Sequence, residues 1–381
     1  MEKKVLYISE LADLGGGEQI LLSWVEGLDR NKFRPVLLCA CEGPLPDKLR
    51  KMNVPVTVFP FGSIGRAAGF LPFISLPALL RFSRLLFSLR PELVHSNCFS
   101  GLVFSALPAR LLGIPVIWSD HGWTSGGGLQ GRLIGFFASG ITAVSDTVRG
   151  FLLGGGSISP GKVEILYPGV DAERFQKSEG AGETRKSLSV PPGAFVVGMV
   201  ARLQEVKGHR LFFQAAAEIR RKHPDARFLV VGARLFARSA DDGYETAVAG
   251  WIREFGLENS VIMAGYREDM PALFSCMDVM VCASRRESFC LSVAEALACE
   301  TPVVSTRCGG PEEIIEDGAS GLLVPPADPA AMAAAVLRLL ENRGEAAAMG
   351  RAGRARVKER FSPASVASRL DRIYGSLTEK P

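Results

Sequence analysis

Short apolar runs alternate with longer amphipathic segments along almost the whole of this 381-residue chain, and this alternation restricts the folds open to it. The runs fall into two series, and each run is a predicted β-strand. The first series is residues 5–9, 35–40, 56–60, 93–96, 116–119, 141–145 and 163–166, and the second is residues 195–201, 227–232, 261–264, 279–283, 302–305 and 321–324. Strands that alternate with helices form parallel sheets covered by helices on both faces. The sequence therefore predicts an α/β protein with two doubly wound, Rossmann-like domains.

A chain of this length is expected to divide its core between two domains. Residues 176–193 are rich in Gly, Ser, Glu and Lys and include Pro191-Pro192, which indicates a linker. We predict an N-terminal domain at 1–168, a C-terminal domain at 169–360 that begins with a linker at 169–193, and a separate final helix in 361–381. Two such sheets in tandem leave an interdomain cleft at the carboxyl ends of their strands, where a ligand is expected.

Charge and cysteine content narrow the class of protein. The net charge of +4, from 44 basic and 40 acidic residues, is too small to indicate nucleic-acid binding by itself. The eight Cys and four His show no metal-ligand spacing, so no metal is expected and a reducing compartment is favoured. The apolar run at residues 5–9 is too short for the core of a signal peptide. A cytoplasmic protein is expected.

Two glutamates eight positions apart are the most informative local feature. Residues 279–283 are a predicted buried strand and residues 288–299 a predicted helix with almost no polar face, so Glu287 lies at the mouth of the helix and Glu295 inside it. A rise of ~1.5 Å per residue spaces them by roughly 12 Å, about the length of a nucleotide-sugar from hexose to ribose. The amides of a helix N-terminus also attract a diphosphate. Alternatively, Glu287 is a cap-region acid and Glu295 a hydrogen-bonded core acid.

Two basic residues follow the strand predicted at 195–201. Arg202 and Lys207 lie in the turn at its carboxyl end, at the same edge of the sheet as the two glutamates. Arg binds a diphosphate bidentately and Lys supplies a compact charge, so the pair suits a diphosphate leaving group. The alternative is a solvated surface pair.

Residues of the first half add a second cluster. The first strand leads into Gly15, Gly16, Gly17 and Glu18 before a helix, where glycine amides can approach a phosphate or sugar closely. The spacing is neither Gly-x-Gly-x-x-Gly nor a Gly-Lys-Ser/Thr loop, which disfavours dehydrogenases and P-loop kinases. His121 follows the strand at 116–119 and is placed to bind a sugar hydroxyl. A bare turn and a structural histidine remain the alternatives.

Together these motifs resemble the retaining, nucleotide-sugar-dependent glycosyltransferases of family 4, over nearly the whole chain. The family's Glu-x7-Glu element matches Glu287 and Glu295, and its Arg and Lys pair matches Arg202 and Lys207. Its glycine loop and its cleft histidine match Gly16-Gly17-Glu18 and His121. Further matches are residues 143–145, 169–171 and 321–324, and Gly309-Gly310 with Glu313.

The resemblance implies the GT-B fold, in which two Rossmann-like domains face an interdomain cleft and the last helix returns to the first domain. It implies that Glu295 holds the donor ribose, that Arg202 and Lys207 bind the diphosphate, and that Glu287 contacts the sugar. Glu287, Arg202, Lys207 and His121 are the implied catalytic residues. The other implied donor contacts are Gly16, Gly17, Glu18, Gly265, Tyr266, Arg267, Ser288, Phe289, Cys290 and Leu291. The family needs no divalent metal, so no cofactor is expected.

One departure from the family pattern bears on the donor. Ser288 and Cys290 stand where the family often has glycine, so their side chains crowd the amides that should meet the donor. An altered sugar preference is the expected effect.

The expected activity is transfer of a hexose-type sugar from a nucleoside diphosphate-sugar to an acceptor hydroxyl, with the anomeric configuration retained. In the scheme that the resemblance implies, a phosphate oxygen of the donor accepts the acceptor's proton. The rivals are a non-catalytic sugar-nucleotide-binding protein and a GT-B epimerase or phosphorylase.

The acceptor is harder to predict than the donor. Residues 70–89 combine Arg81, Arg84 and the following Arg90 with apolar side chains that include Phe73. This pattern suits a helix lying on the inner face of the cytoplasmic membrane, and it equally suits an ordinary amphipathic helix. A glycan or lipid-linked acceptor in cell-envelope or exopolysaccharide assembly, with peripheral membrane contact, is the resulting hypothesis.

Overall fold

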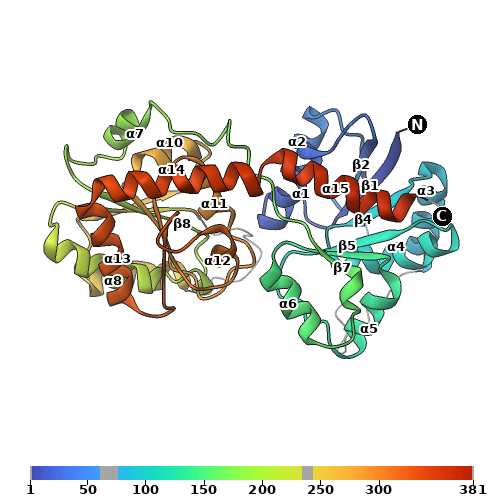
Figure 1. Ribbon diagram of the computed structural model, residues 1–381. Helices are drawn as coiled ribbons and strands as arrows, with labels where there is room; N and C mark the ends of the chain where they lie inside the picture. The colour runs from blue at the N-terminus through green and yellow to red at the C-terminus, as the bar shows by residue number, and fades with distance from the viewer. Residues whose placement is uncertain (1, 61–75, 234–242, 380–381) are drawn as a thin grey trace. The chain divides into compact units, whose positions relative to one another are not determined.

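The computed structural model describes residues 2–60, 76–233 and 243–379 (Figure 1). Part of the predicted amphipathic segment, including Phe73, lies outside these residues. The chain divides into two compact units. Unit 1 is Met1–Gly169 with Pro363–Pro381, and unit 2 is Val170–Ser362.

Unit 1 is built on a parallel seven-stranded sheet with the order β3-β2-β1-β4-β5-β6-β7. Its strands are β1 (Lys3–Ser9), β2 (Phe33–Cys39), β3 (Val56–Val58), β4 (Leu93–Ser96), β5 (Val116–Asp120), β6 (Gly140–Ala143) and β7 (Val163–Ile165). Its helices are α1 (Gly16–Gly27), α2 (Pro44–Lys51), α3 (Leu76–Leu89), α4 (Phe99–Leu111), α5 (Gly128–Phe137), α6 (Asp146–Gly154) and α15 (Pro363–Thr378), with a 3-10 turn at Pro160–Lys162. Helix α1 packs beside α15, and α4 packs between α3 and α5.

A buried polar network ties α15 to the sheet of unit 1. His95 on β4 joins its Nδ1 to the Tyr374 hydroxyl at 2.6 Å and its Nε2 to the Ser119 hydroxyl at 2.6 Å. Tyr374 also pairs with the hydroxyl of Tyr7 at 2.9 Å, and Ser119 with that of Thr142 at 2.7 Å. Burial lowers the pKa of His95 to about 3, so its ring is neutral at pH 7. Each hydroxyl of the network therefore has a partner inside the core.

Unit 2 is built on a parallel six-stranded sheet with the order β10-β9-β8-β11-β12-β13. Its strands are β8 (Val196–Val200), β9 (Arg227–Val231), β10 (Val261–Gly265), β11 (Val279–Cys282), β12 (Val303–Thr306) and β13 (Leu322–Val324). Its helices are α7 (Ala181–Ser187), α8 (His209–Lys222), α9 (Tyr244–Glu254), α10 (Met270–Cys276), α11 (Leu291–Ala298), α12 (Gly310–Ile314), α13 (Pro329–Glu341) and α14 (Arg343–Arg360), with a 3-10 turn, η2 (Glu205–Lys207).

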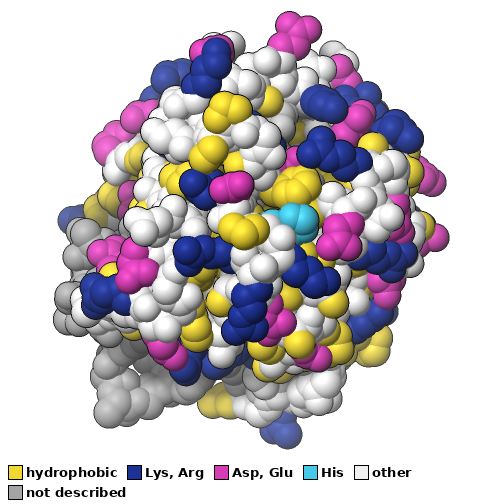
Figure 2. All heavy atoms as spheres, turned by 90° about the vertical axis from the view of Figure 1, so that its left-hand side faces the viewer, with side chains coloured by type: hydrophobic (Ala, Val, Ile, Leu, Met, Phe, Trp, Pro, Cys, Tyr) yellow, Lys and Arg dark blue, Asp and Glu magenta, His cyan; other side chains and the backbone are white. Residues whose placement is uncertain are grey.

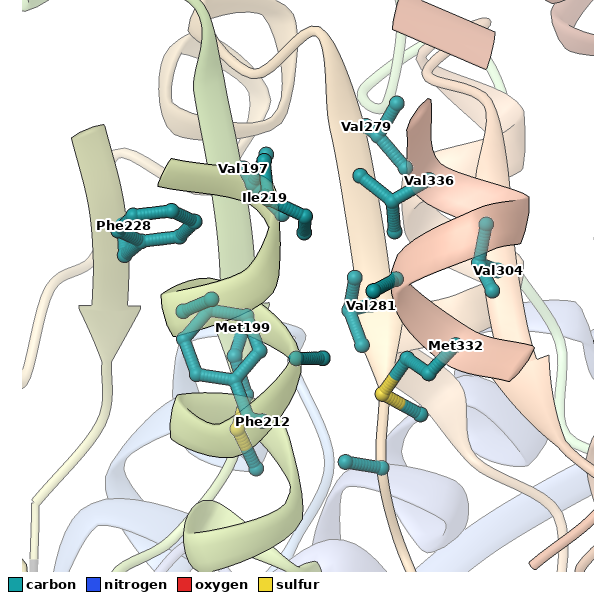
Figure 3. Packing of buried hydrophobic residues seen from close by; sticks show 14 of the residues in the cluster. Val197, Met199, Phe212, Ile219, Phe228, Val279, Val281, Val304, Met332 and Val336 are labelled. Carbon is teal, nitrogen blue, oxygen red and sulfur yellow. The ribbon is translucent and has the colours of Figure 1, made fainter. Parts of the chain in front are cut away.

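Helices cover both faces of this second sheet. Helices α8, α9 and α13 form one layer, and α7, α10, α11 and α14 form the other (Figure 1). Figure 3 shows how the first layer packs: Phe212 and Ile219 of α8 and Met332 and Val336 of α13 lie on the apolar strands, including Val281. Continuous valine-rich strands are buried on both faces, which is what a parallel sheet requires.

The two doubly wound sheets and every predicted strand are confirmed, with slightly different strand ends. The stretch predicted as a linker, residues 176–193, contains α7 and belongs to unit 2. Its Arg185 forms an ion pair with Asp278 at 2.7 Å, so a polar composition here accompanies ordered structure. The interdomain cleft stays a prediction.

The surface carries both signs of charge. Figure 2 shows basic and acidic side chains interspersed over the face of unit 2 that it presents. No helix in the described ranges combines the length and the apolarity needed to span a membrane.

Candidate functional site

A buried ion pair lies at the carboxyl edge of the sheet in unit 2. The Lys207 ammonium is 2.7 Å from Oε1 of Glu287, and their side chains are 17% and 9% exposed. The Ser284 hydroxyl donates to the same carboxylate oxygen at 2.6 Å. Since buried charges are unfavourable unless paired and hydrogen-bonded, the three groups form one unit of structure.

The backbone fixes both partners of the pair. Lys207 ends η2, and Gly208 after it has a φ of 76°. A Cβ at Gly208 would lie 1.9 Å from the Ala283 carbonyl oxygen, so only glycine fits this approach to the end of β11. On the other side, the Glu287 amide donates to the Cys308 carbonyl at 2.8 Å and its carbonyl accepts from Gly310 at 2.9 Å. The pair is therefore held by two independent loops.

The electrostatics of the pair follow from burial. Burial raises the pKa of Glu287, and the nearby Lys207 opposes this shift. Burial acts to lower the pKa of Lys207, but Glu287 and the neighbouring Cys290 and Cys282 together raise it, and the net direction is upward. Lys207 is consequently protonated at neutral pH. The Lys207 ammonium is already largely shielded from water, so it would attract a bound anion more strongly than an exposed lysine does.

Glu295 is the second predicted carboxylate, and it lies in α11. It is half-buried, and its carboxylate has no hydrogen-bond or ion-pair partner among the described residues. Burial raises its pKa to about 7, and only the charge of Arg174 opposes this shift. Part of the Glu295 population is thus ionised at pH 7 and able to accept hydrogen bonds from a ligand.

The helix between the two glutamates begins later than predicted. The expected helix at 288–299 is wrong at its start, because α11 begins at Leu291. Cys290 caps it with a φ of 79°, and a Cβ at Gly310 would meet the buried Phe289 backbone at 2.3 Å. Close packing on Gly310 holds residues 287–290 outside the helix. A helical rise therefore cannot space Glu287 from Glu295, and the 12 Å estimate does not hold.

The remaining predicted residues of unit 2 lie at neighbouring strand ends. Arg202 follows β8, which pairs with β11, so it shares the edge that carries Glu287. Within the described ranges it forms no ion pair. Gly265 ends β10 with a φ of 65°, Tyr266 is 61% exposed, and Arg267 bonds Asp269 at 2.8 Å. The structure thus joins Lys207 to Glu287 directly and places the others along the same edge.

A second cluster lies in unit 1. The Nε2 of His121 is 2.6 Å from Oδ1 of Asn97, and the ring stacks on Trp24 with centroids 5.4 Å apart. Gly17 lies against this ring, because a Cβ there would be 3.6 Å from it. Gly16 and Gly17 open α1, and Glu18 in its first turn is buried. The predicted glycine loop and His121 are therefore neighbours.

The protonation of His121 follows from its surroundings. Burial lowers its pKa to about 4, so the ring is neutral at pH 7. Nε2–H then donates to Asn97, and Nδ1 is a buried acceptor that has no partner among the described groups. The adjacent Asp120 accepts from the Gly122 amide at 3.1 Å, and burial raises its pKa to about 6.

Sequence reasoning missed several groups at these sites. Asn97 and Ser284 follow β4 and β11, so the same strand-end rule that found His121 could have found them. Trp24 carries no such signal, because it lies inside α1 and meets His121 only through the fold.

Two family descriptions match the chain. The family described as "Glycosyl transferases group 1" matches residues 181–356, and "Glycosyltransferase Family 4" matches residues 14–174. The chain belongs to these glycosyltransferases, as the motif resemblance predicted.

Named relatives agree with this placement. A D-inositol 3-phosphate glycosyltransferase of Kineococcus radiotolerans is 31% identical over 288 residues, which cover 68% of this chain and 66% of the relative. That of Corynebacterium kroppenstedtii is 34% identical over 227 residues, covering 58% of this chain and 49% of the relative. The chain thus spans between about half and two thirds of the length of these curated relatives.

Solved structures share the fold. Anabaena HepE in complex with UDP-glucose superposes with a TM-score of 0.85 at 24% identity, over 98% of this chain and 100% of that one. A glycosyltransferase of Rickettsia africae gives a TM-score of 0.86 at 20% identity, over 100% of each chain. These likenesses confirm the GT-B fold class.

Proposed function

We propose that this protein is a retaining glycosyltransferase that moves a hexose from a nucleoside diphosphate-sugar to an acceptor hydroxyl. The observation that carries the proposal is the polar edge of unit 2, where a buried Lys207–Glu287 pair and the carboxylate of Glu295, which has no partner among the described residues, follow the neighbouring strands β8 and β11. A core that only needed stability gains little from such groups, since an apolar replacement is often as stable.

Each residue of this edge has a role that its surroundings support. Lys207, which is already desolvated and charged, and Arg202 neutralise the departing diphosphate. Glu295 accepts hydrogen bonds from the ribose hydroxyls. Glu287 orients the Lys207 ammonium and contacts the sugar. The amides of residues 289 to 291, at the start of α11, face the donor, and Gly265 to Arg267 lie beside the base.

The transfer itself needs positioning and charge stabilisation more than a protein nucleophile. As the diphosphate leaves, positive character develops at the anomeric carbon, and the acceptor oxygen attacks from the face that the diphosphate leaves. A phosphate oxygen of the leaving group accepts the acceptor's proton. In unit 1, the neutral His121 offers Nδ1 to a sugar hydroxyl. We further propose that no divalent metal is required, because two protein cations serve the leaving group.

The comparisons suggest which donor and acceptor to test first. HepE was crystallised with UDP-glucose, and the curated relatives are named for D-inositol 3-phosphate. We therefore propose a UDP-hexose donor and a hydroxyl acceptor of the phosphorylated polyol or lipid-linked glycan kind.

The experiment combines three measurements on the whole chain. UDP release from UDP-glucose, UDP-galactose and UDP-N-acetylglucosamine is followed with and without D-inositol 3-phosphate or a lipid-linked glycan, in the presence of EDTA. Product NMR gives the anomeric configuration. Acceptor-dependent release with an α-linked product supports the proposal. Donor binding without release would instead indicate a binding protein, isomerised UDP-sugar an epimerase, and an inverted product a non-retaining enzyme.

We also propose that an anionic membrane surface presents the acceptor, in keeping with a role in cell-envelope or exopolysaccharide assembly. Exposed apolar side chains lie on the adjacent helices α3, α4 and α5: Leu76, Leu80, Phe87, Leu107, Leu111, Leu129 and Phe136. Exposed arginines lie among them, at positions 81, 84, 90, 110 and 132. Apolar groups mixed with arginine suit a surface of anionic lipid.

Vesicle sedimentation tests this contact. The chain should bind vesicles that contain anionic phospholipid and should bind neutral vesicles weakly. Leu80→Glu should weaken binding, whereas Met263→Glu in unit 2 should not. Equal binding by both variants would contradict the assignment of this face.

A further inference from the structure

Three thiols surround the carboxylate of Glu287. Cys282 ends β11, Cys290 caps α11, and Cys308 follows β12, the neighbour of β11 in the sheet. The sulfurs of Cys282 and Cys290 are 3.8 Å apart, and the Cys308 thiol is hydrogen-bonded to Cys282. One ligand atom from each of Cys282, Glu287 and Cys290 lies within 4.8 Å of the other two. Three soft or charged ligand groups thus converge on one point.

The geometry distinguishes metal binding from disulfide formation. Two thiolates on a tetrahedral zinc ion are separated by roughly 3.8 Å, given a Zn–S distance of about 2.3 Å. The Cys282 and Cys290 sulfurs already have that separation. A disulfide needs about 2.05 Å, so the two sulfurs as they lie are not bonded to each other. Their separation matches that of two ligands on a shared ion.

Access and charge also fit an ion. Cys290 is half-buried, whereas Cys282 and Glu287 are buried, so of the three ligand residues Cys290 has the most contact with solvent. Loss of two thiol protons to solvent gives two thiolates beside one carboxylate, and the Lys207 ammonium offsets a single negative charge. A divalent cation neutralises the two negative charges that remain.

We propose that Cys282, Cys290 and Glu287 form a binding site for a thiophilic divalent metal ion of the Zn²⁺ type, with a fourth position open to solvent. Binding draws the carboxylate of Glu287 away from Lys207. If the proposed function holds, the ion is an inhibitor, because it disrupts the groups assigned to the donor. The transfer reaction itself uses no metal.

Cobalt titration of the reduced, metal-free chain tests the site without relying on activity. Co²⁺ gives a thiolate-to-metal charge-transfer absorption when cysteine binds it. The wild type should show this absorption and saturate near one equivalent, and Zn²⁺ should abolish it by displacement. The matched variants are Cys290→Gly and Cys41→Ser. The first suits the left-handed backbone at position 290, so its folding is protected, and the second removes an exposed cysteine in unit 1.

Cys290→Gly should bind Co²⁺ at least tenfold more weakly and lose most of the absorption, while Cys41→Ser should match the wild type. Circular dichroism and thermal unfolding confirm that both variants are folded. A wild type without saturable absorption, or a Cys290→Gly variant that binds as the wild type does, would overturn the site.

Inhibition is measured separately. Zn²⁺ at saturating concentration should lower UDP-hexose binding at least tenfold in the wild type, reversibly with EDTA, and have little effect in Cys290→Gly. Unchanged donor binding by the zinc-loaded wild type would overturn the inhibitory role. A chain that binds Co²⁺ but no UDP-hexose would refute the proposed function and leave the metal site standing.

Discussion

Replacing Lys207 with methionine separates a structural from a donor-binding role of the buried pair. Lys207→Met keeps the apolar stem of the side chain and removes the charge that lies 2.7 Å from Glu287. Among the described residues, the Ser284 hydroxyl is then the remaining hydrogen-bond donor to Oε1 of Glu287. Its carboxyl group must either stay charged in a buried position or take up a proton.

Proton uptake by Glu287 limits the loss of stability. Protonating a carboxyl group of ordinary pKa 4.5 at pH 7 costs about 3.4 kcal/mol, at about 1.36 kcal/mol per pH unit. At pH 5.5 the same step costs about 1.4 kcal/mol. The raised pKa of Glu287 in the variant lets the folded state hold the proton, so stability returns as the pH falls. Lys207→Met should therefore destabilise unit 2 by ~3 kcal/mol at pH 7 and by about half of that at pH 5.5.

A double variant completes the test. Lys207→Met with Glu287→Gln contains no buried charge and should recover to within about 1 kcal/mol of the wild type. Hydrogen exchange of the α8 and α11 amides under native conditions reports unit 2 alone, and Lys222→Ala, at the exposed last residue of α8, is the control. A loss below 1 kcal/mol that does not change with pH would refute the reasoning. UDP-hexose binding should stay at least tenfold weaker in both variants; its recovery in the double variant would leave the pair a purely structural role.

Three other predictions follow from described contacts. Glu295→Gln should weaken UDP-hexose binding by ~10- to 100-fold at pH 8, which corresponds to the loss of one charged hydrogen bond. In the wild type, calorimetry should show affinity falling below pH 7 as Glu295 takes up a proton, and the variant should lack this fall. Unfolded chains protonate His95 below pH 6.5, whereas the folded ring stays neutral to about pH 3, so this residue lowers the free energy of unfolding by ~2 kcal/mol at pH 5. Urea unfolding of His95→Gln should not show this loss of stability in acid. An unchanged pH profile in the variant would contradict the prediction. Gly350→Ala would bring a Cβ to 2.1 Å from the Glu300 carbonyl oxygen and should destabilise unit 2 by ~1–3 kcal/mol. Gly344→Ala, where a Cβ meets open space, should leave stability unchanged. Thermal unfolding measures both effects.

The periodicity of the sequence was enough to predict both sheets, because each strand is a continuous apolar run between turn residues. The same reading placed Arg202, Lys207 and Glu287 at one edge, since parallel strands bring their carboxyl ends together. These predictions rest on local pattern and on the topology of a parallel sheet.

Features that depend on long-range packing could not be predicted from the sequence. The start of α11 is set by the contact of Phe289 with Gly310, and the left-handed backbone of Cys290 has no signal in its side chain. The thiol cluster joins positions 282, 290 and 308, whose spacing matches no metal motif, because the fold and not the motif brings them together. The hydrogen-bonded partners His95 and Tyr374 lie 279 positions apart, so no local pattern could join them.

The hydrogen bonds between His95 and Tyr374 set an order for how this chain can mature during synthesis. Unit 2 is one uninterrupted stretch, so it can complete its core as soon as residue 362 has left the ribosome. The first residues of unit 1 are translated before unit 2. Until α15 emerges, Nδ1 of His95 and the hydroxyl of Tyr7 lack their shared partner, the hydroxyl of Tyr374. The unit whose first residues emerge earliest can thus complete its buried polar network only after α15 has emerged.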